Sequence, residues 1–186
     1  MLSIEKIERR ARQLLKDAAI EEPPIDVRAV ARFLKATLRP VSADEDISGA
    51  ILREGNHIII GVNAAHHPNR KRFTIAHELG HLVLHDAAVQ VDHRFTQVVS
   101  RDEIQLAALR SRISSEAVDP HEIEANRFAA ALLMPADFLE KSLQTSKLPL
   151  GEKAIARLAT EYNVSVKAMT FRLVNLGVPV DMDVAG

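Results

Sequence analysis

The sequence predicts an α+β protein in which one small antiparallel or mixed sheet packs against several helices. Amphipathic patterns with helical spacing cover most of the chain, and strand-forming runs lie only between residues 37 and 63. At 186 residues, of which 47% are hydrophobic, the chain can bury one substantial core. Its formal net charge of −1 gives no support to a general nucleic-acid-binding surface.

The N-terminal part is predicted to contain two helices, a strand and a hairpin. Apolar residues at helical spacing predict a helix over 3–17, and the prolines of "EEPPID" end it. Asp26 can cap a second helix over 27–36. Pro40 lacks a donor, so "TLRPVS" is predicted as an edge strand. In 48–63, apolar residues flank a polar turn, which predicts a β-hairpin.

The C-terminal part is predicted to be helical. We expect helices over 69–85, over "DPHEIEANRFAAALLM" and over "PADFLEKSL". Residues 86–118 are the least readable part, because "RDEIQLAALRSRI" is compatible with a helix whereas Val89, Val91, Val98 and Val99 favour strand or loop. The chain then ends in two short helices, "EKAIARLATEY" and "SVKAMTFRLVNLG", which form a helix-turn-helix-like pair. We therefore expect a main domain over 1–145 and a C-terminal helical subdomain over 146–186.

The composition limits the chemistry that the chain can perform. Because there is no cysteine, thiolate catalysis and cysteine-ligated zinc are excluded, and any metal must be held by His, Asp or Glu. The opening residues do not resemble a signal peptide, and no apolar run approaches the ~18 residues of a membrane span. We expect a cytoplasmic enzyme or regulator without a membrane partner.

The stretch "FTIAHELGHLVLHD" carries the strongest chemical signal. His77 and His81 are four residues apart, so on a helix both imidazoles can face one ion. Zinc accepts neutral nitrogen ligands of this kind. Glu78 can then take a proton from a water molecule activated by the ion and deliver it to a leaving amine. This is the chemistry of the H-E-x-x-H motif of zinc metallopeptidases, with a surface stripe on a helix as the alternative.

A third ligand must come from another element. His85 continues the stripe, but one straight helix cannot wrap three such residues around a tetrahedral ion. The metzincin arrangement needs a histidine six positions after His81, where this chain has Ala87. A glutamate on a second helix is the remaining common solution, and "HEIEANRFAAALLMP" supplies one.

Spacing alone does not decide which residue of that second helix is the third metal ligand. Glu122 can bind the ion, but it can also close a capping box with Asp119, and His121 competes as a ligand. Asn126 shares a face with Glu122 and can orient a ligand histidine through its other ring nitrogen. Glu124 lies about 200° around the helix from Glu122 and is expected to face away.

Several segments resemble the ImmA/IrrE family of metallo-endopeptidases. The resemblance is most specific in "HELGH" followed by "EIEANRFAAALLMP". "EEPPIDVRAVARFLKATLRPVS" resembles the N-terminal helix and first strand of the family, "GAILREGNHIIIGVN" its hairpin, and "IARLATEYNVSVKAMTFRLVNLGV" its C-terminal helices. Residues 86–118 match no part of the pattern.

The resemblance implies a zincin-like zinc endopeptidase with one ion per chain, for which manganese is a substitute. His77, His81 and Glu122 match the metal ligands, and Glu78 matches the catalytic glutamate. Asn126 matches the last position of the family's E-x-x-A-N element, whose side chain would contact a ligand histidine rather than the ion. The main domain would then be the metallopeptidase domain.

The resemblance also implies a partner: a helix-turn-helix repressor of the XRE type, encoded nearby, whose cleavage releases transcription in a stress response. The alternative is a metal-containing regulator or toxin–antitoxin-associated protein that binds a repressor or DNA without proteolysis. Lys167, Arg172 and Asn175 are a thin set for reading DNA. The oxyanion-stabilising residue stays open, with these candidates: His66, His67, His93, Arg70 and Arg72.

Overall fold

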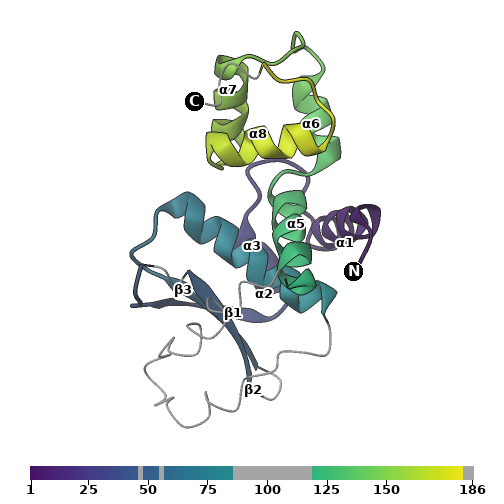
Figure 1. Ribbon diagram of the computed structural model, residues 1–186. Helices are drawn as coiled ribbons and strands as arrows, with labels where there is room; N and C mark the ends of the chain where they lie inside the picture. Colours follow the sequence, from purple (N-terminus) through teal and green to yellow (C-terminus); the bar gives the residue numbers. More distant parts are fainter. Residues whose placement is uncertain (46–47, 55–56, 86–118, 182–186) are drawn as a thin grey trace.

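A computed structural model describes residues 1–45, 48–54, 57–85 and 119–181 (Figure 1). Its elements, in chain order, are α1 (Ile4–Asp17), α2 (Val27–Phe33), β1 (Ala36–Val41), β2 (Gly49–Glu54), β3 (His57–Asn63), α3 (Pro68–Leu84), α5 (Pro120–Leu133), α6 (Ala136–Leu143), α7 (Glu152–Tyr162) and α8 (Val166–Asn175). This architecture confirms the predicted α+β class. The prediction for residues 86–118 lies outside the described residues.

The sheet has the strand order β1-β3-β2. β2 and β3 form the predicted antiparallel hairpin, in which Gly49 pairs with Val62. β1 runs parallel to β3, with Ala36 opposite Ile58, and occupies one edge as expected from Pro40. Because the hairpin places β3 in the middle, the other edge of the sheet is β2.

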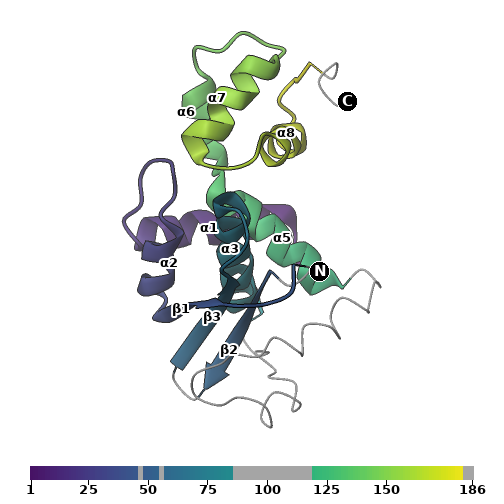
Figure 2. The same ribbon diagram turned by 90° about the vertical axis from the view of Figure 1, so that its left-hand side faces the viewer.

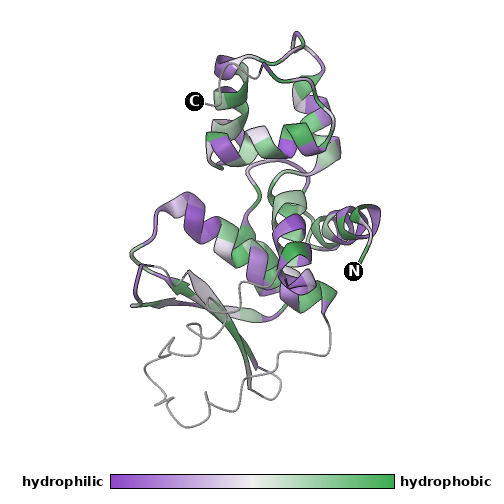
Figure 3. Cartoon of the chain, viewed as in Figure 1, coloured by the Kyte–Doolittle hydropathy of each residue, from purple (hydrophilic) through white to green (hydrophobic). Residues whose placement is uncertain are grey.

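The helices lie in successive layers on the sheet. α3 contacts β2 and β3, α5 packs on α3, and α1 packs on α5 (Figures 1 and 2). The core between these layers contains fully buried side chains from every one of them, including Ile60, Leu79, Phe128 and Leu15. The helices carry both hydrophilic and hydrophobic residues (Figure 3), so each can turn an apolar face toward the next layer.

The contact between α3 and α5 is unusually close at Gly80. A Cβ atom at this position would lie 3.1 Å from the Cα atom of Ala125 and 3.2 Å from the ring of Phe128. Glycine on one helix and alanine on the other therefore let the two backbones approach. This approach brings the middle of α3 next to the first turns of α5.

The last three helices lie together at one end of the molecule (Figure 1). Tyr162 is fully buried among them, and its hydroxyl lies 3.1 Å from the Ser142 hydroxyl. Asn163 ends α7 in the left-handed conformation with φ 53°, which makes the turn into α8. The proposed division of the chain between residues 145 and 146 stays a prediction. No helix in the described residues is long and apolar enough to span a membrane.

Arg172 connects α8 to the rest of the fold. Its buried guanidinium donates to both carboxylate oxygens of Glu8 on α1, with a distance of 2.8 Å from Nη2 to Oε2. Its Nε donates to the carbonyl oxygen of Met134 at 2.9 Å. A bidentate pair of this kind fixes orientation as well as distance. The C-terminal helices are thereby held against α1 and the end of α5.

Gly80→Val tests the close approach of α3 and α5. We expect it to destabilise the fold by about 1–3 kcal/mol, because the added side chain forces two packed helices apart. Chemical denaturation with a far-UV circular dichroism readout measures this change. Lys153→Val at an exposed position of α7 is the control for helix propensity and should cost less than about 1 kcal/mol. Equal stability losses in the two variants would contradict the close packing.

Candidate metal centre

Helix α3 is built to present the H-E-x-x-H residues to α5. It begins with His67 as the N-cap, whose ring accepts from the Asn69 N–H at 3.2 Å, and with Pro68 in its first turn. His77 and His81 lie one turn apart, with their ring centroids separated by 4.7 Å. Both side chains are largely buried, so the structure excludes the surface stripe considered from sequence alone.

Three side chains from the two helices meet at one point. The Nε2 atoms of His77 and His81 are 3.0 Å apart, and the Glu122 oxygens lie 3.1 Å from the first and 3.2 Å from the second. A tetrahedral zinc site with bonds of about 2.0–2.1 Å has ligand atoms about 3.3–3.4 Å apart. These separations are close to those of neighbouring ligand atoms in such a tetrahedron, and this group could hold a metal ion.

Glu122 reaches this point from the first turn of α5. Asp119 caps the helix, as expected, and its side chain accepts from the His121 N–H at 2.9 Å. The Glu122 carboxylate contacts both histidines rather than serving only as part of a cap. His121, the competing ligand, instead places its ring 4.4 Å from that of His85.

Asn126 lies one turn beyond Glu122 and contacts His77. Its Oδ1 atom is 3.0 Å from the Nδ1 atom of His77. A carbonyl oxygen only accepts, so Nδ1 carries the proton, and a neutral His77 then has a lone pair on Nε2. That lone pair points to where His81 and Glu122 also converge. A donor set of this kind suits a divalent cation.

Glu78 is buried on α3, with a residue exposure of 3%. It lies beside the start of β2, since a Cβ atom on Gly49 would be 3.7 Å from its Oε1 atom. The same Cβ atom would be 2.3 Å from Thr74 Cγ2, so only glycine fits here. The lack of a side chain at Gly49 leaves the Glu78 carboxylate next to the sheet edge.

The charges at the site shift two pKa values. Burial lowers the pKa of His77, but its hydrogen bond to Glu122 and the nearby charges of Glu78 and Glu122 outweigh this effect and raise it. Hydrogen bonds from His77 and His81 hold the pKa of Glu122 far below its usual range. Without a metal, His77 and Glu122 therefore form a charge-assisted pair.

A second buried pair lies behind His81 and was missed in the sequence. Glu124 faces away from Glu122 as expected, but it is buried, and its Oε2 atom lies 3.0 Å from Nε2 of His85. It also accepts from the Leu2 N–H. Burial opposes ionisation of Glu124, but these hydrogen bonds lower its pKa. The signal in the sequence that could have revealed the burial of Glu124 was its place between two apolar residues, Ile123 and Ala125, on a predicted helix.

The candidates for an oxyanion-stabilising group make their hydrogen bonds elsewhere. His66 Nε2 lies 2.9 Å from the carbonyl oxygen of Glu45, and His67 caps α3. Arg70 donates to the Ser48 hydroxyl and Arg72 to the carbonyl oxygen of Asn163. His93 lies outside the described residues. Of the three residues considered for reading DNA (Lys167, Arg172 and Asn175), Arg172 is buried and paired with Glu8.

A small sheet under an H-E-x-x-H helix, with a carboxylate supplied by a second helix, is the arrangement of zinc metallopeptidases in which a glutamate completes the ligands. The comparison with known families agrees with this class. Residues 37–174 match the peptidase family described as the IrrE N-terminal-like domain. The chain belongs to this family, as its resemblance to ImmA/IrrE proteins predicted.

Two curated relatives bear the name radiation response metalloprotease IrrE. The relative from Deinococcus radiodurans is 30% identical over 118 residues, which are 63% of this chain and 31% of the relative. The relative from Deinococcus deserti is 34% identical over 124 residues, which are 66% of this chain and 38% of the relative. The matched residues therefore span only about a third of either relative.

A solved structure shares the fold. It is a transcriptional regulator from Mycobacterium tuberculosis, with a TM-score of 0.59 and 14% sequence identity. The similarity covers 91% of this chain and 46% of the regulator. At this identity it supports the fold alone.

The raised pKa of His77 can be measured in metal-free protein. We expect the pKa to lie above the usual value of about 6.5 and to fall in Glu122→Gln, which removes the negative charge beside the ring. NMR of the histidine ring protons against pH gives this value. Glu140→Gln, at an exposed position of α6, should leave it unchanged.

The same pair makes the stability of the metal-free fold depend on pH. Folding raises the pKa of His77, so its contribution is full below about pH 6.5 and is lost as the pH rises through the folded value. Folding lowers the pKa of Glu122, so its contribution is present above about pH 4.3 and is lost as the pH falls. An unchanged His77 pKa in Glu122→Gln would contradict this pairing.

Proposed function

We propose that this protein is a zinc-dependent endopeptidase. His77, His81 and Glu122 bind one ion, Glu78 is the catalytic base, and Asn126 orients His77. The observation that carries the proposal is the convergence of two Nε2 atoms, 3.0 Å apart, on one carboxylate, with Oε2 of Glu122 3.1 Å from His77 and Oε1 3.2 Å from His81. Membership of a peptidase family supports the same activity. Manganese, which also accepts nitrogen and carboxylate ligands, is a substitute for zinc.

The protein residues divide the work of peptide hydrolysis. When bound, zinc makes a water molecule more acidic and polarises a carbonyl group. Glu78 takes the proton from the attacking water and passes it to the leaving amine. Its burial keeps this proton transfer away from bulk solvent, and Asn126 keeps the His77 lone pair on the nitrogen that faces the ion.

The edge strand β2 is suited to hold the substrate backbone. β2 begins at Gly49, beside Glu78, and no strand in the described part of the chain pairs with its outer edge. An extended peptide can add to such an edge through backbone hydrogen bonds. A peptide bound in this way would pass the Glu78 carboxylate.

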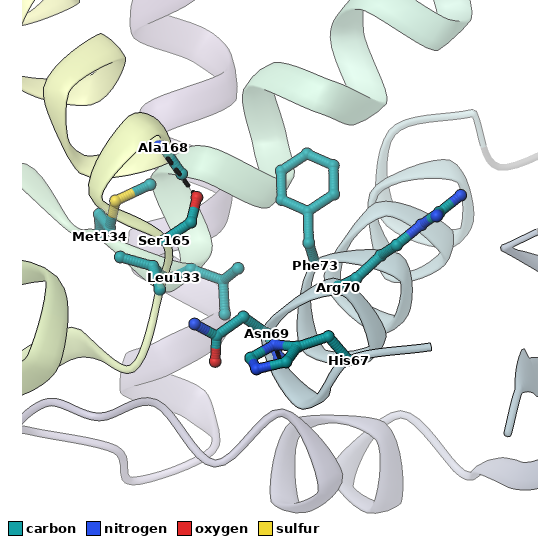
Figure 4. A pocket seen from close by; sticks show the side chains of 9 residues that line it. His67, Asn69, Arg70, Phe73, Leu133, Met134, Ser165 and Ala168 are labelled. Atoms are coloured by element: carbon teal, nitrogen blue, oxygen red, sulfur yellow. Dashed lines mark hydrogen bonds between the residues drawn. The ribbon is translucent and has the colours of Figure 1, made fainter. Parts of the chain in front are cut away.

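A groove between α3, α5 and α8 is suited to hold an apolar side chain of the same substrate. It consists of two adjoining hollows of about 370 and 340 Å³, of which Figure 4 shows the first. Both hollows are lined by Phe73, Met134, Ser165 and Ala168. The second hollow is also lined by Asn126, which contacts His77, so the groove leads to the metal ligands. Arg70 lines the first hollow and Lys167 the second, and these two basic side chains favour a substrate segment that also carries carboxylates.

We infer that the natural substrate is a cytoplasmic helix-turn-helix repressor, encoded nearby, whose cleavage releases transcription in a stress response. The names of the two Deinococcus relatives, which join metalloprotease and radiation response, support this inference. The groove next to α8 provides room for a protein segment. A regulator that binds a repressor without cutting it would not need a base such as Glu78 beside the metal ligands.

The activity is tested by separating metal binding from catalysis. We expect purified protein to hold about one zinc per chain, Glu122→Ala to lose it, and Glu78→Gln to keep it while cleavage falls at least about 100-fold. Metal content by mass spectrometry and cleavage of the co-expressed repressor measure the two effects. Zinc retention in Glu122→Ala, or full cleavage by Glu78→Gln, would contradict the proposal.

The groove is tested by filling it. Ala168→Trp should raise KM for the cleaved substrate roughly tenfold, equivalent to about 1.4 kcal/mol, because the indole occupies the space of a substrate side chain. Zinc content should stay unchanged. Val166→Trp places the same residue on α8 at an exposed position outside the groove and is the control. Equal KM values for these two variants would show that the substrate binds elsewhere.

A further inference from the structure

Behind His81 lies a continuous line of polar groups that ends on a buried carboxylate. The Nδ1 atoms of His81 and His85 are 3.2 Å apart, and Nε2 of His85 is 3.0 Å from Oε2 of Glu124. The side chains of His85 and Glu124 are only 9% and 4% exposed. We propose that Glu124, acting through His85, sets the tautomer of His81 and so aims the lone pair of its Nε2 atom at the metal.

The proton positions follow from the carboxylate. An ionised carboxylate only accepts hydrogen bonds, so the Nε2 atom of His85 carries a proton. A neutral His85 then has a lone pair on Nδ1, which can only accept from His81. The Nδ1 atom of His81 must therefore carry a proton, so its Nε2 atom can present a lone pair once an ion replaces the hydrogen bond between Nε2 and Glu122.

His85 thus orients the ring of His81 in the same way that Asn126 orients the ring of His77. Asn126 supplies an oxygen acceptor to Nδ1 of His77, and His85 supplies a nitrogen acceptor to Nδ1 of His81. With an ion in place, both ligand histidines would present lone pairs from their Nε2 atoms, which are 3.0 Å apart. Groups that orient ligand histidines in this way commonly change metal affinity by 10–100-fold.

Glu124 is itself fixed in place, which an orienting group requires. It lies on α5, where Ala125 packs against Gly80, and the Leu2 N–H donates to its Oε1 atom. His85 follows the last residue of α3 as its C-cap. The line from Glu124 to His81 therefore connects the same two helices as the metal ligands and keeps their spacing. His85 and Glu124 are positioning residues that do not touch the ion.

The tautomer of His81 is the most direct readout. In metal-free, ¹⁵N-labelled protein near pH 8, the ring nitrogen shifts of His81 should show a proton on Nδ1. In His85→Ala and Glu124→Leu the share of the Nδ1–H form should fall in favour of the form with a proton on Nε2 alone. In His85→Asn the Nδ1–H form should persist, because the amide oxygen replaces the accepting nitrogen. A general loss of packing would not separate these variants.

Zinc affinity is the second readout, measured by competition with a chromophoric chelator. His85→Ala and Glu124→Leu should bind zinc about 10–100-fold more weakly than wild type, whereas His85→Asn should stay close to it. His121→Ala is the control, since its ring lies against His85 but outside the line to Glu124. Circular dichroism confirms that each variant is folded before the comparison.

The inference rests on the proposed metal site, and the two can fail separately. If wild-type protein binds no zinc, the proposed function is wrong, and the tautomer comparison still decides the role of Glu124 and His85. If wild type binds zinc but His85→Ala and Glu124→Leu keep its affinity and the same His81 tautomer, the inference is wrong. Loss of affinity in His85→Asn with an unchanged tautomer would also contradict it.

Discussion

The close packing of α3 on α5 is the constraint on which the site depends. With Gly80 against Ala125, the two backbones approach closely enough for side chains on both sides of this contact to meet. Glu122 then reaches His77 and His81 on one side, and Glu124 reaches His85 on the other. The proposed ligands and their supporting groups thus share one helix–helix interface, whose spacing fixes the geometry of both.

The C-terminal helices are joined to the rest of the fold through α8. Arg172, which in the sequence resembles a DNA-contacting residue, holds α8 against α1 through Glu8. Its hydrogen bond to the Met134 carbonyl places α8 over the end of α5, where the groove forms. The same ion pair therefore helps to set the position of this groove relative to the proposed metal ligands.

Local patterns predicted much of the fold, and the residues proposed as metal ligands do lie close together. Helical spacing, the Asp119 cap and the polar turn of the hairpin are short-range signals, and each element appears where expected. The burial and partners of Glu124 could not be predicted in this way. Helix geometry gives the angle between Glu122 and Glu124, but it does not tell which other segments pack against the face that carries Glu124. The Leu2 N–H and His85 arrive there from distant parts of the chain. The parallel pairing of β1 with β3 is likewise a long-range contact.

Anomalous diffraction at the zinc absorption edge, from crystals of the zinc-loaded protein, tests the central claim most directly. The account predicts one strong peak per chain, about 2.0–2.2 Å from the Nε2 atoms of His77 and His81 and from a carboxylate oxygen of Glu122. It also predicts that His85 and Glu124 lie outside the coordination sphere. A peak bound by His85, His121 or Glu124, or no peak between α3 and α5, would contradict the account.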